Sequence, residues 1–576
     1  MKTPFKKRGQ QSSRQRLHLF SEQAALSGER HIKENFLKRL PHIGDVRLFV
    51  LEWALIVIAL FMLAVTQSLW FSDSYSVEAY TYGGTYTEAT LGKVSSLNPL
   101  FASTNSEKVL SKLLFSGLTT SDSSGHVGNA LAKSVRSDGS GKTWTVKLRD
   151  NLKWSDGEPL TSEDVIFTAN LIKNPNVVSN YSSNLNRVQV SENASGEIVF
   201  ELPAVYSEFA SALDFPILPK HILENVDPST LLESSFSSSP VSSGPFSHNA
   251  SQVVGSTGES MIYLSANEHY YRGEPKIENF VVHAYLTTDD IKSAIKSGSA
   301  TATAELLPTD SKEISSKTIY EKQTKINSGV FLFMNTRNGA LKNKSLRKAI
   351  QSGLDVNEVR STIGDEQPLD YPILKSQLEL ETWPELPALD VESARNIVSS
   401  SEEKTLNLVT INTGYFPSLA EDISGQLESL GFKVNLQTYD PGQEFVVNVI
   451  ANRSYDLLIY EIELGANPDL LVYYHSSQAN QSGLNLSNYN SSIADDMILS
   501  ARETADLNQK KQKYEAFLKR WIEDAPSIGL YQVNMSYYFD KNVKPFSEDV
   551  TLVSPTDRFV DVKYWGVEKT RKNRTP

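Results

Sequence analysis

One apolar run, Leu48–Trp70, divides the chain and constrains its fold more than any other feature. As a helix, its 23 residues would rise about 34 Å, and the hydrocarbon core of a bilayer is about 30 Å thick. Thirteen of these residues are Leu, Ile, Val or Phe, which favours insertion by about 4–8 kcal/mol. Glu52 opposes insertion by less than about 3 kcal/mol, because it lies near one end of the run. We therefore predict a transmembrane helix over residues 48–71.

The charges that precede the run predict its orientation. Residues 1–47 contain eleven Lys or Arg and four Asp or Glu, a net charge of +7. Positive residues remain in the cytoplasm, so we expect a single-pass cell-membrane protein with residues 72–576 outside. A cleaved signal peptide is the alternative, but the tail is long and no small-x-small cleavage site closely follows the run. Residues 1–45 form either an unstructured topogenic tail or an amphipathic helix, SGERHIKENFLKRL, on anionic lipid.

The remainder of the chain is acidic and lacks cysteine. The whole chain carries a charge of −12 and the tail +7, so the remainder carries −19. Such a segment is a poor nucleic-acid binder, because phosphate contacts need Lys and Arg. The absence of cysteine excludes disulfides, thiolate metal sites and a lipid-modified N-terminal cysteine. Any membrane attachment must therefore come from the polypeptide itself.

Hydrophobic periodicity beyond residue 83 alternates between strand and helix. Thr161–Leu171 begins as a helix would. Thr161 is a suitable N-terminal capping residue, and Asp164 follows it at the spacing of a capping pair. Residues 419–430 repeat at helical spacing up to Gly431, a natural helix end. Strand, helix and strand in this order imply parallel strands with a right-handed crossover, hence an α/β fold. The expected strands are 143–148, 198–202, 406–410, 434–438 and 455–460.

Catalytic and metal-binding motifs are missing. The nine histidines lack metal-ligand spacing, and neither H-E-x-x-H nor G-x-S-x-G occurs. Gly139-Ser-Gly-Lys142-Thr143 resembles a phosphate loop, but Arg136 stands where a Gly is needed and a strand follows, so a hairpin turn is expected. Glu461 and Glu463 fit either an exposed strand end or a binding role. We predict no enzyme activity, no cofactor and no metal.

Six stretches, in order, resemble one family. The most specific, WTVKLRDNLKWSDGEPLTSEDVIF over 144–167, is similar to the W-S-D-G-x-P-[LV]-T-x-x-D-V signature of extracytoplasmic solute-binding proteins of peptide and nickel ABC transporters, family 5. Together the stretches cover about residues 83–566. The other five are LNPLFASTNSEKVLSKLLFSGLTT at 97–120, SGPF at 243–246, NEHYYRGEPKIENFVVHAY at 267–285, residues 333–355, and DLLIYEIELGANPDLLVYYH at 456–475.

This resemblance implies an α/β, two-lobed periplasmic-binding-protein-like fold (class II, Venus-flytrap) after one transmembrane helix, with lobes that close on a ligand about a hinge. The implied division is a basic cytoplasmic tail (1–47), a transmembrane helix (48–71), a linker (72–82), lobe I (83–327 plus 527–566), lobe II (328–526) and a C-terminal tail (567–576). The implied ligand-binding residues are Ser103, Thr104, Asn105, Tyr181, Tyr415, Tyr439, Asp440, Glu461, Glu463 and Asn467.

One position departs from the family pattern. Many peptide-binding members place an Asp before the last Pro motif, where it pairs with the α-amine of the peptide. Leu464 stands here, so Glu461 or Glu463 would have to take that role. The resemblance implies a monomeric subunit that delivers oligopeptides to ABC permease subunits. A non-peptide solute, such as a metal chelate or an oligosaccharide, and a membrane-tethered sensor with the same fold are the alternatives.

Overall fold

The computed structural model describes residues 47–573, apart from 123–124, 178, 186, 255–257, 364–366, 441–444, 482 and 547–549. The prediction for residues 1–45 lies outside the described residues. The chain divides into two compact units, Met1–Ala79 with Thr570–Pro576, and Tyr80–Lys569.

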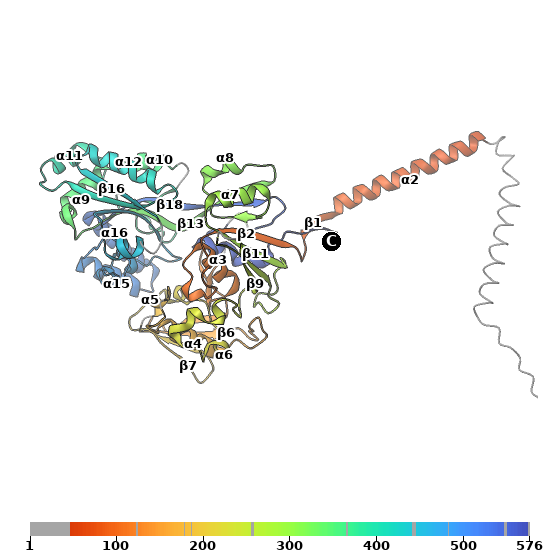
Figure 1. Ribbon diagram of the computed structural model, residues 1–576, viewed down its shortest axis with the longest axis horizontal. Helices are drawn as coiled ribbons and strands as arrows, with labels where there is room; N and C mark the ends of the chain where they lie inside the picture. The colour runs from red at the N-terminus through yellow and green to blue at the C-terminus, as the bar shows by residue number, and fades with distance from the viewer. Residues whose placement is uncertain are drawn as a thin grey trace, which may run out of the picture. The chain divides into compact units, whose positions relative to one another are not determined.

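The smaller unit contains one long helix, α2 (Arg47–Tyr75), drawn without interruption in Figure 1. Its segment Arg47–Ser68, with a mean hydropathy of 2.7, is long and apolar enough to cross a membrane. Strand β1 (Ser76–Tyr80) follows and pairs with β19 (Lys569–Asn573). The stretches predicted as a linker and a C-terminal tail thus hold the end of a helix and two strands. This pairing joins opposite ends of the chain, so no local sequence pattern reveals it.

An eleven-stranded mixed sheet runs through the larger unit, in the order β16-β15-β17-β13-β18-β12-β2-β11-β10-β9, with β14 against β18. Strands β13 (Ile319–Met334) and β18 (Ser527–Asp540) are long and antiparallel. The other bounds are β2 Thr85–Leu91, β9 Phe246–Val254, β10 Glu259–Ala266, β11 Asn279–Tyr285, β12 Ala302–Thr303, β14 Gln367–Pro368, β15 Thr405–Ile411, β16 Lys433–Tyr439 and β17 Leu457–Glu463.

The sheet carries separate hydrophobic cores, and these define the two lobes. Ile326 and Met535 belong to the core of lobe I, whereas Val330 and Tyr531 belong to a core of lobe II. Val533 contacts both cores. Strands β13 and β18 therefore pass from one lobe to the other within a few residues. The strand register also shifts there, between Lys325 and Gly329.

The predicted lobe boundaries at 327/328 and 526/527 stay predictions. The first falls between Ile326 and Val330, where the core changes. Ile528 and Leu530, which follow the second, still pack on the lobe II core.

Lobe I also holds a four-stranded antiparallel sheet, β5-β6-β8-β7, beside helix α4 (Figure 1). Thr161 caps α4 in a reciprocal pair with Asp164. The lobe I bounds are α3 Asn105–Leu114, β3 Thr119–Ser121, β4 Val127–Asn129, β5 Ala132–Ser137, β6 Thr143–Leu148, α4 Ser162–Ile172, α5 Ser182–Leu185, β7 Gln189–Glu192, β8 Ile198–Glu201, η3 Phe209–Leu213, α6 Lys220–Leu223, α7 Thr288–Ser297, η6 Pro308–Asp310, α8 Ser311–Ile314 and η10 Pro555–Tyr564.

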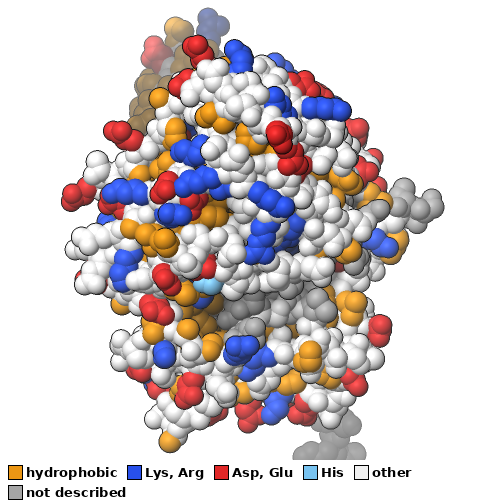
Figure 2. All heavy atoms as spheres, turned by 90° about the vertical axis from the view of Figure 1, so that its left-hand side faces the viewer, with side chains coloured by type: hydrophobic (Ala, Val, Ile, Leu, Met, Phe, Trp, Pro, Cys, Tyr) orange, Lys and Arg blue, Asp and Glu red, His pale blue; other side chains and the backbone are white. Residues whose placement is uncertain are grey.

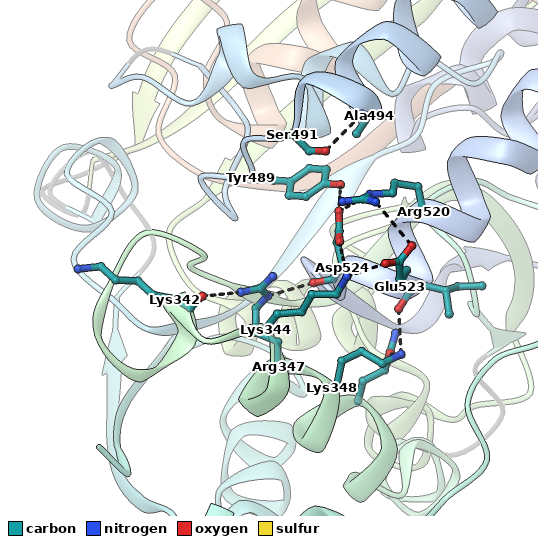
Figure 3. A network of polar contacts seen from close by, with 12 residues as sticks. Lys342, Lys344, Arg347, Lys348, Tyr489, Ser491, Ala494, Arg520, Glu523 and Asp524 are labelled. Carbon is teal, nitrogen blue, oxygen red and sulfur yellow. Dashed lines mark hydrogen bonds and ion pairs between the residues drawn. The ribbon is translucent and has the colours of Figure 1, made fainter. Parts of the chain in front are cut away.

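Helices surround the lobe II part of the sheet. Their bounds are α9 Lys344–Gly353, α10 Val356–Ser361, α11 Val391–Ser399, α12 Phe416–Ser429, α14 Leu471–Tyr474, α15 Ser492–Glu503 and α16 Leu507–Asp524. A polar network joins the end of α16 to the start of α9 (Figure 3). In it, Asp524 accepts hydrogen bonds from the Tyr489 hydroxyl at 2.6 Å and Arg520 Nε at 2.7 Å, and lies 2.9 Å from Lys344 Nζ.

The expected elements are confirmed. Strands β6 and β8 and helix α4 lie where alternation and capping predicted them. Strand β15 is parallel to both β16 and β17, with α12 between β15 and β16. Gly139 and Gly141 have positive φ angles in the turn between β5 and β6, a hairpin and not a phosphate loop.

Candidate ligand-binding cleft

The carboxyl ends of three parallel strands form one wall in lobe II. Strands β15, β16 and β17 run parallel, so their ends meet at one edge of the sheet, the usual ligand side of such sheets. Tyr439 and Asp440 lie at the end of β16, where Asn412 Nδ2 donates to Asp440 Oδ1 at 3.2 Å. Tyr415 begins α12 just after β15, and Glu461 and Glu463 end β17.

Aromatic rings cover part of this wall. The ring centroid of Phe445 lies 5.8 Å from that of Tyr439 and 6.0 Å from that of Tyr460. The Tyr439 hydroxyl donates to Gln437 Oε1 at 3.0 Å. Tyr439 thus combines apolar area with a polar tip, a combination suited to binding polar chains.

In lobe I, three predicted site residues lie at the N-terminus of α3. The Thr104 hydroxyl accepts from the Glu107 N–H at 3.2 Å, and the Ser103 hydroxyl donates to Glu107 Oε2 at 2.9 Å. These two predicted site residues therefore form a helix cap. Asn105 instead donates through Nδ2 to Glu305 Oε2, at 2.8 Å.

Electrostatic effects link side chains of lobe I with side chains of lobe II. Burial raises the pKa of Glu461 in lobe II; repulsion from Glu463 adds to the rise, whereas a hydrogen bond from Ser328 and the ammonium of Lys108 on α3 oppose it. Burial also raises the pKa of Tyr181 in lobe I, and the charges of Asp214 and Glu463 add to the rise. The structure therefore brings Tyr181, Glu461 and Glu463 to one region.

Asp214, which sequence reasoning missed, lies in the same region. Its side chain keeps contact with solvent, but the surrounding protein raises its pKa to about 6 by desolvation. Lys112 opposes this shift, whereas Asp557 and Glu463 increase it. Lys112 is itself paired with Asp557, at 2.8 Å. Asp214 lies directly after η3, and the sequence around it matches no recognisable motif. Only the structure shows that it lies near Glu463.

The cleft carboxylates lack protein cations as direct partners. Among the described residues, Asp214, Glu461 and Glu463 form no ion pair within 4.0 Å. Across all the residues that the structure describes, no group of three or more His, Asp or Glu could hold a metal ion. Figure 2 shows one face of the molecule with a hollow near its middle, and Lys and Arg side chains lie above and below this hollow.

Asn467, the last predicted site residue, contacts the other lobe. Its Nδ2 donates to Glu208 Oε2 of lobe I at 3.0 Å. Asn467 thus forms a contact between the lobes. No pattern in the sequence around residue 208 indicated this partner.

Comparisons with known proteins agree with this arrangement. A family model described as bacterial extracellular solute-binding proteins, family 5 Middle, matches residues 126–483. The oligopeptide-binding protein AppA of Bacillus subtilis is 26% identical over 532 residues, covering 85% of this chain and 94% of AppA. The structure of B. subtilis AppA in complex with a nonapeptide aligns with a TM-score of 0.72 at 22% identity, over 84% of this chain and 99% of that one.

Two further solved structures share the fold. The ABC transporter substrate-binding protein CtaP of Listeria monocytogenes aligns with a TM-score of 0.74 at 23% identity, over 84% of this chain and 100% of CtaP. NikZ of Campylobacter jejuni, in complex with Ni(L-His), aligns with a TM-score of 0.72 at 21% identity, over 84% and 99%. These likenesses confirm the predicted two-lobed α/β fold.

Proposed function

The chain belongs to family 5 of the bacterial extracellular solute-binding proteins, and from this premise we propose that it captures oligopeptides between its lobes and delivers them to an ABC permease. Its relatives are substrate-binding proteins of ABC transporters and not enzymes. The similarity to AppA, which covers most of both chains, favours an oligopeptide over other solutes.

The observation that carries this proposal is the set of unpaired carboxylates in the cleft. Glu461 and Asp214 both have raised pKa values because burial disfavours their charged forms. A positively charged ligand group between them would relieve that cost. The α-amine of a peptide is such a group, and Glu461 or Glu463 would pair with it in place of the Asp that many peptide-binding relatives use.

The ligand itself provides the test. Full-length protein is purified from its membrane in mild detergent and denatured, and the released small molecules are identified by mass spectrometry. We expect a mixture of short peptides with free amines. A single non-peptide solute would overturn the peptide assignment. A nickel complex of histidine is the leading competitor, because NikZ, similar in fold, was solved with Ni(L-His).

We further propose that α2 anchors the binding domain to the outer face of the cell membrane. The length and hydropathy of Arg47–Ser68 support this role, and so does the basic tail before it. The chain should stay in the membrane fraction after alkaline extraction, whereas a variant without residues 1–71 should be released in soluble form. Release of the intact chain, or a shorter mature chain that lacks α2, would show that the helix is a cleaved signal.

A further inference from the structure

Three consecutive residues of lobe I, between β8 and η3, each contact lobe II. The guanidinium carbon of Arg502 lies 3.8 Å from the centre of the Tyr206 ring. The Ser207 hydroxyl and N–H both donate to the Arg502 carbonyl, at 2.9 and 3.2 Å. Since Arg502 lies in the last turn of α15, Ser207 satisfies a carbonyl that the helix leaves free.

Glu208 makes the third contact. Its carboxylate forms an ion pair with Lys510 of α16 and accepts a hydrogen bond from Asn467 Nδ2 at 3.0 Å. Lys510 Nζ also donates to the Ser207 hydroxyl at 3.0 Å. Three lobe I residues thus meet three lobe II residues from separate segments.

The charges of this cluster are partly hidden from water. The Lys510 side chain is 7% exposed and the Glu208 side chain 34% exposed. If the lobes separated, the charge-assisted bonds would be lost, but both groups would regain hydration. The regained hydration offsets part of the energy of the lost bonds. The cluster can therefore favour contact between the lobes without preventing their separation.

We propose that Tyr206, Ser207, Glu208, Asn467, Arg502 and Lys510 form a latch that favours the closed arrangement of the lobes without any ligand. They are positioning residues, because they set the distance between the cleft walls through contacts with one another. A protein that is already closed in part loses less affinity to the cost of closing. The inference rests on the two-lobed fold and not on the identity of the ligand.

The distance between the lobes in the ligand-free protein tests the latch. The chain has no cysteine, so Ala194→Cys in lobe I and Glu392→Cys in lobe II, both at exposed positions, give two unique sites for spin labels. The full-length protein in detergent is freed of ligand by unfolding and refolding. Pulsed electron paramagnetic resonance then measures the distance between the two labels, and so the populations of the closed and open arrangements. We expect Glu208→Gln and Lys510→Gln each to lower the closed-to-open ratio about tenfold. The exchange Glu208→Lys with Lys510→Glu should restore much of that ratio.

Glu197→Gln is the matched control. Glu197 pairs with Arg136 at 2.8 Å inside lobe I, and its side chain is 18% exposed, so its loss should leave the distances unchanged. If a Glu208 variant fails to fold, Asn467→Ala removes one bond to the same carboxylate and should shift the ratio in the same direction. Unchanged distances in the folded latch variants, or an equal shift in the control, would overturn the latch. Because no ligand is present, this result is independent of whether the released solute is a peptide.

Discussion

Glu88 inside lobe I and Glu461 at the cleft both lose hydration, but their surroundings differ. Glu88 is fully buried and accepts from Arg558 Nη2 at 2.7 Å, the Tyr537 hydroxyl at 2.7 Å and the Tyr86 hydroxyl at 3.0 Å. Glu461 has no ion-pair partner among the described residues. The paired carboxylate links β2, β18 and η10 and so serves the fold, whereas the unpaired one is the charge that we propose pairs with a ligand. We therefore expect different results when the paired and the unpaired carboxylates are changed.

The largest effect is expected where the paired charge is broken. Arg558→Ala leaves Glu88 buried without its counter-ion, which should lower the free energy of unfolding by about 3–5 kcal/mol. Denaturant unfolding measures the change. Arg136→Ala, which breaks the partly exposed pair with Glu197, should cost no more than about 1 kcal/mol. Similar losses in the two variants would mean that burial does not distinguish these pairs.

The second prediction concerns the unpaired carboxylates of Glu461 and Glu463. Removing them should weaken ligand binding and leave the stability of the fold unchanged. Replacing Glu461 and Glu463 with Ala should weaken the binding of peptides with free amines by about 2–5 kcal/mol. Isothermal titration with a peptide and its N-acetylated form measures this. The acetylated peptide should bind both proteins equally weakly, and Glu421→Ala, at an exposed position on α12, should change nothing. Full affinity in the double variant would remove these residues from the site.

Asp524 extends the comparison to a paired carboxylate in lobe II. Burial disfavours its charge, but hydrogen bonds from Tyr489, Lys344 and Arg520 outweigh this and lower its pKa. A lowered pKa contributes stability above the unfolded value of about 3.9, and that contribution is lost as pH falls through the folded value. Asp524→Asn should therefore cost about 1–3 kcal/mol at pH 7 and less below pH 3. An equal cost at both pH values would assign the effect to packing instead of charge.

Local patterns in the sequence predicted much of the fold. The alternation in Thr143–Leu148 and the helical spacing before Gly431 both gave elements that the structure confirms, because each depends on residues a few positions apart. The pairing of β1 with β19 left no such trace, since it joins segments from opposite ends of the chain.

The site was less accessible to the same reasoning. Ser103 and Thr104 stay predicted ligand-binding residues, and the structure shows that the Ser103 hydroxyl bonds Glu107 while the Thr104 hydroxyl bonds the Glu107 N–H and the Lys93 carbonyl. Asp214 and Glu208 were missed, because what distinguishes them is their position opposite the other lobe. A cleft built from two lobes brings together residues far apart in sequence, so single residues on each wall carry no local signal.

The smallest predicted effect has the opposite sign from that at Asp524. The pKa of Asp214 is raised to about 6 by desolvation, so the folded protein holds a proton there between about pH 4 and pH 6, whereas the unfolded chain does not. The stability from that proton is present below pH 4 and is lost as pH rises through 6. Asp214→Asn should therefore stabilise the ligand-free protein at pH 7, and not at pH 4. The gain should stay below about 1 kcal/mol, because the side chain remains in contact with solvent.

Denaturant midpoints at the two pH values measure the gain in stability of Asp214→Asn. A bound peptide with a free amine should abolish this gain by supplying the missing cation. A variant that is less stable than the natural protein at pH 7 would show that Asp214 is a structural charge like Glu88 and does not belong to the binding set.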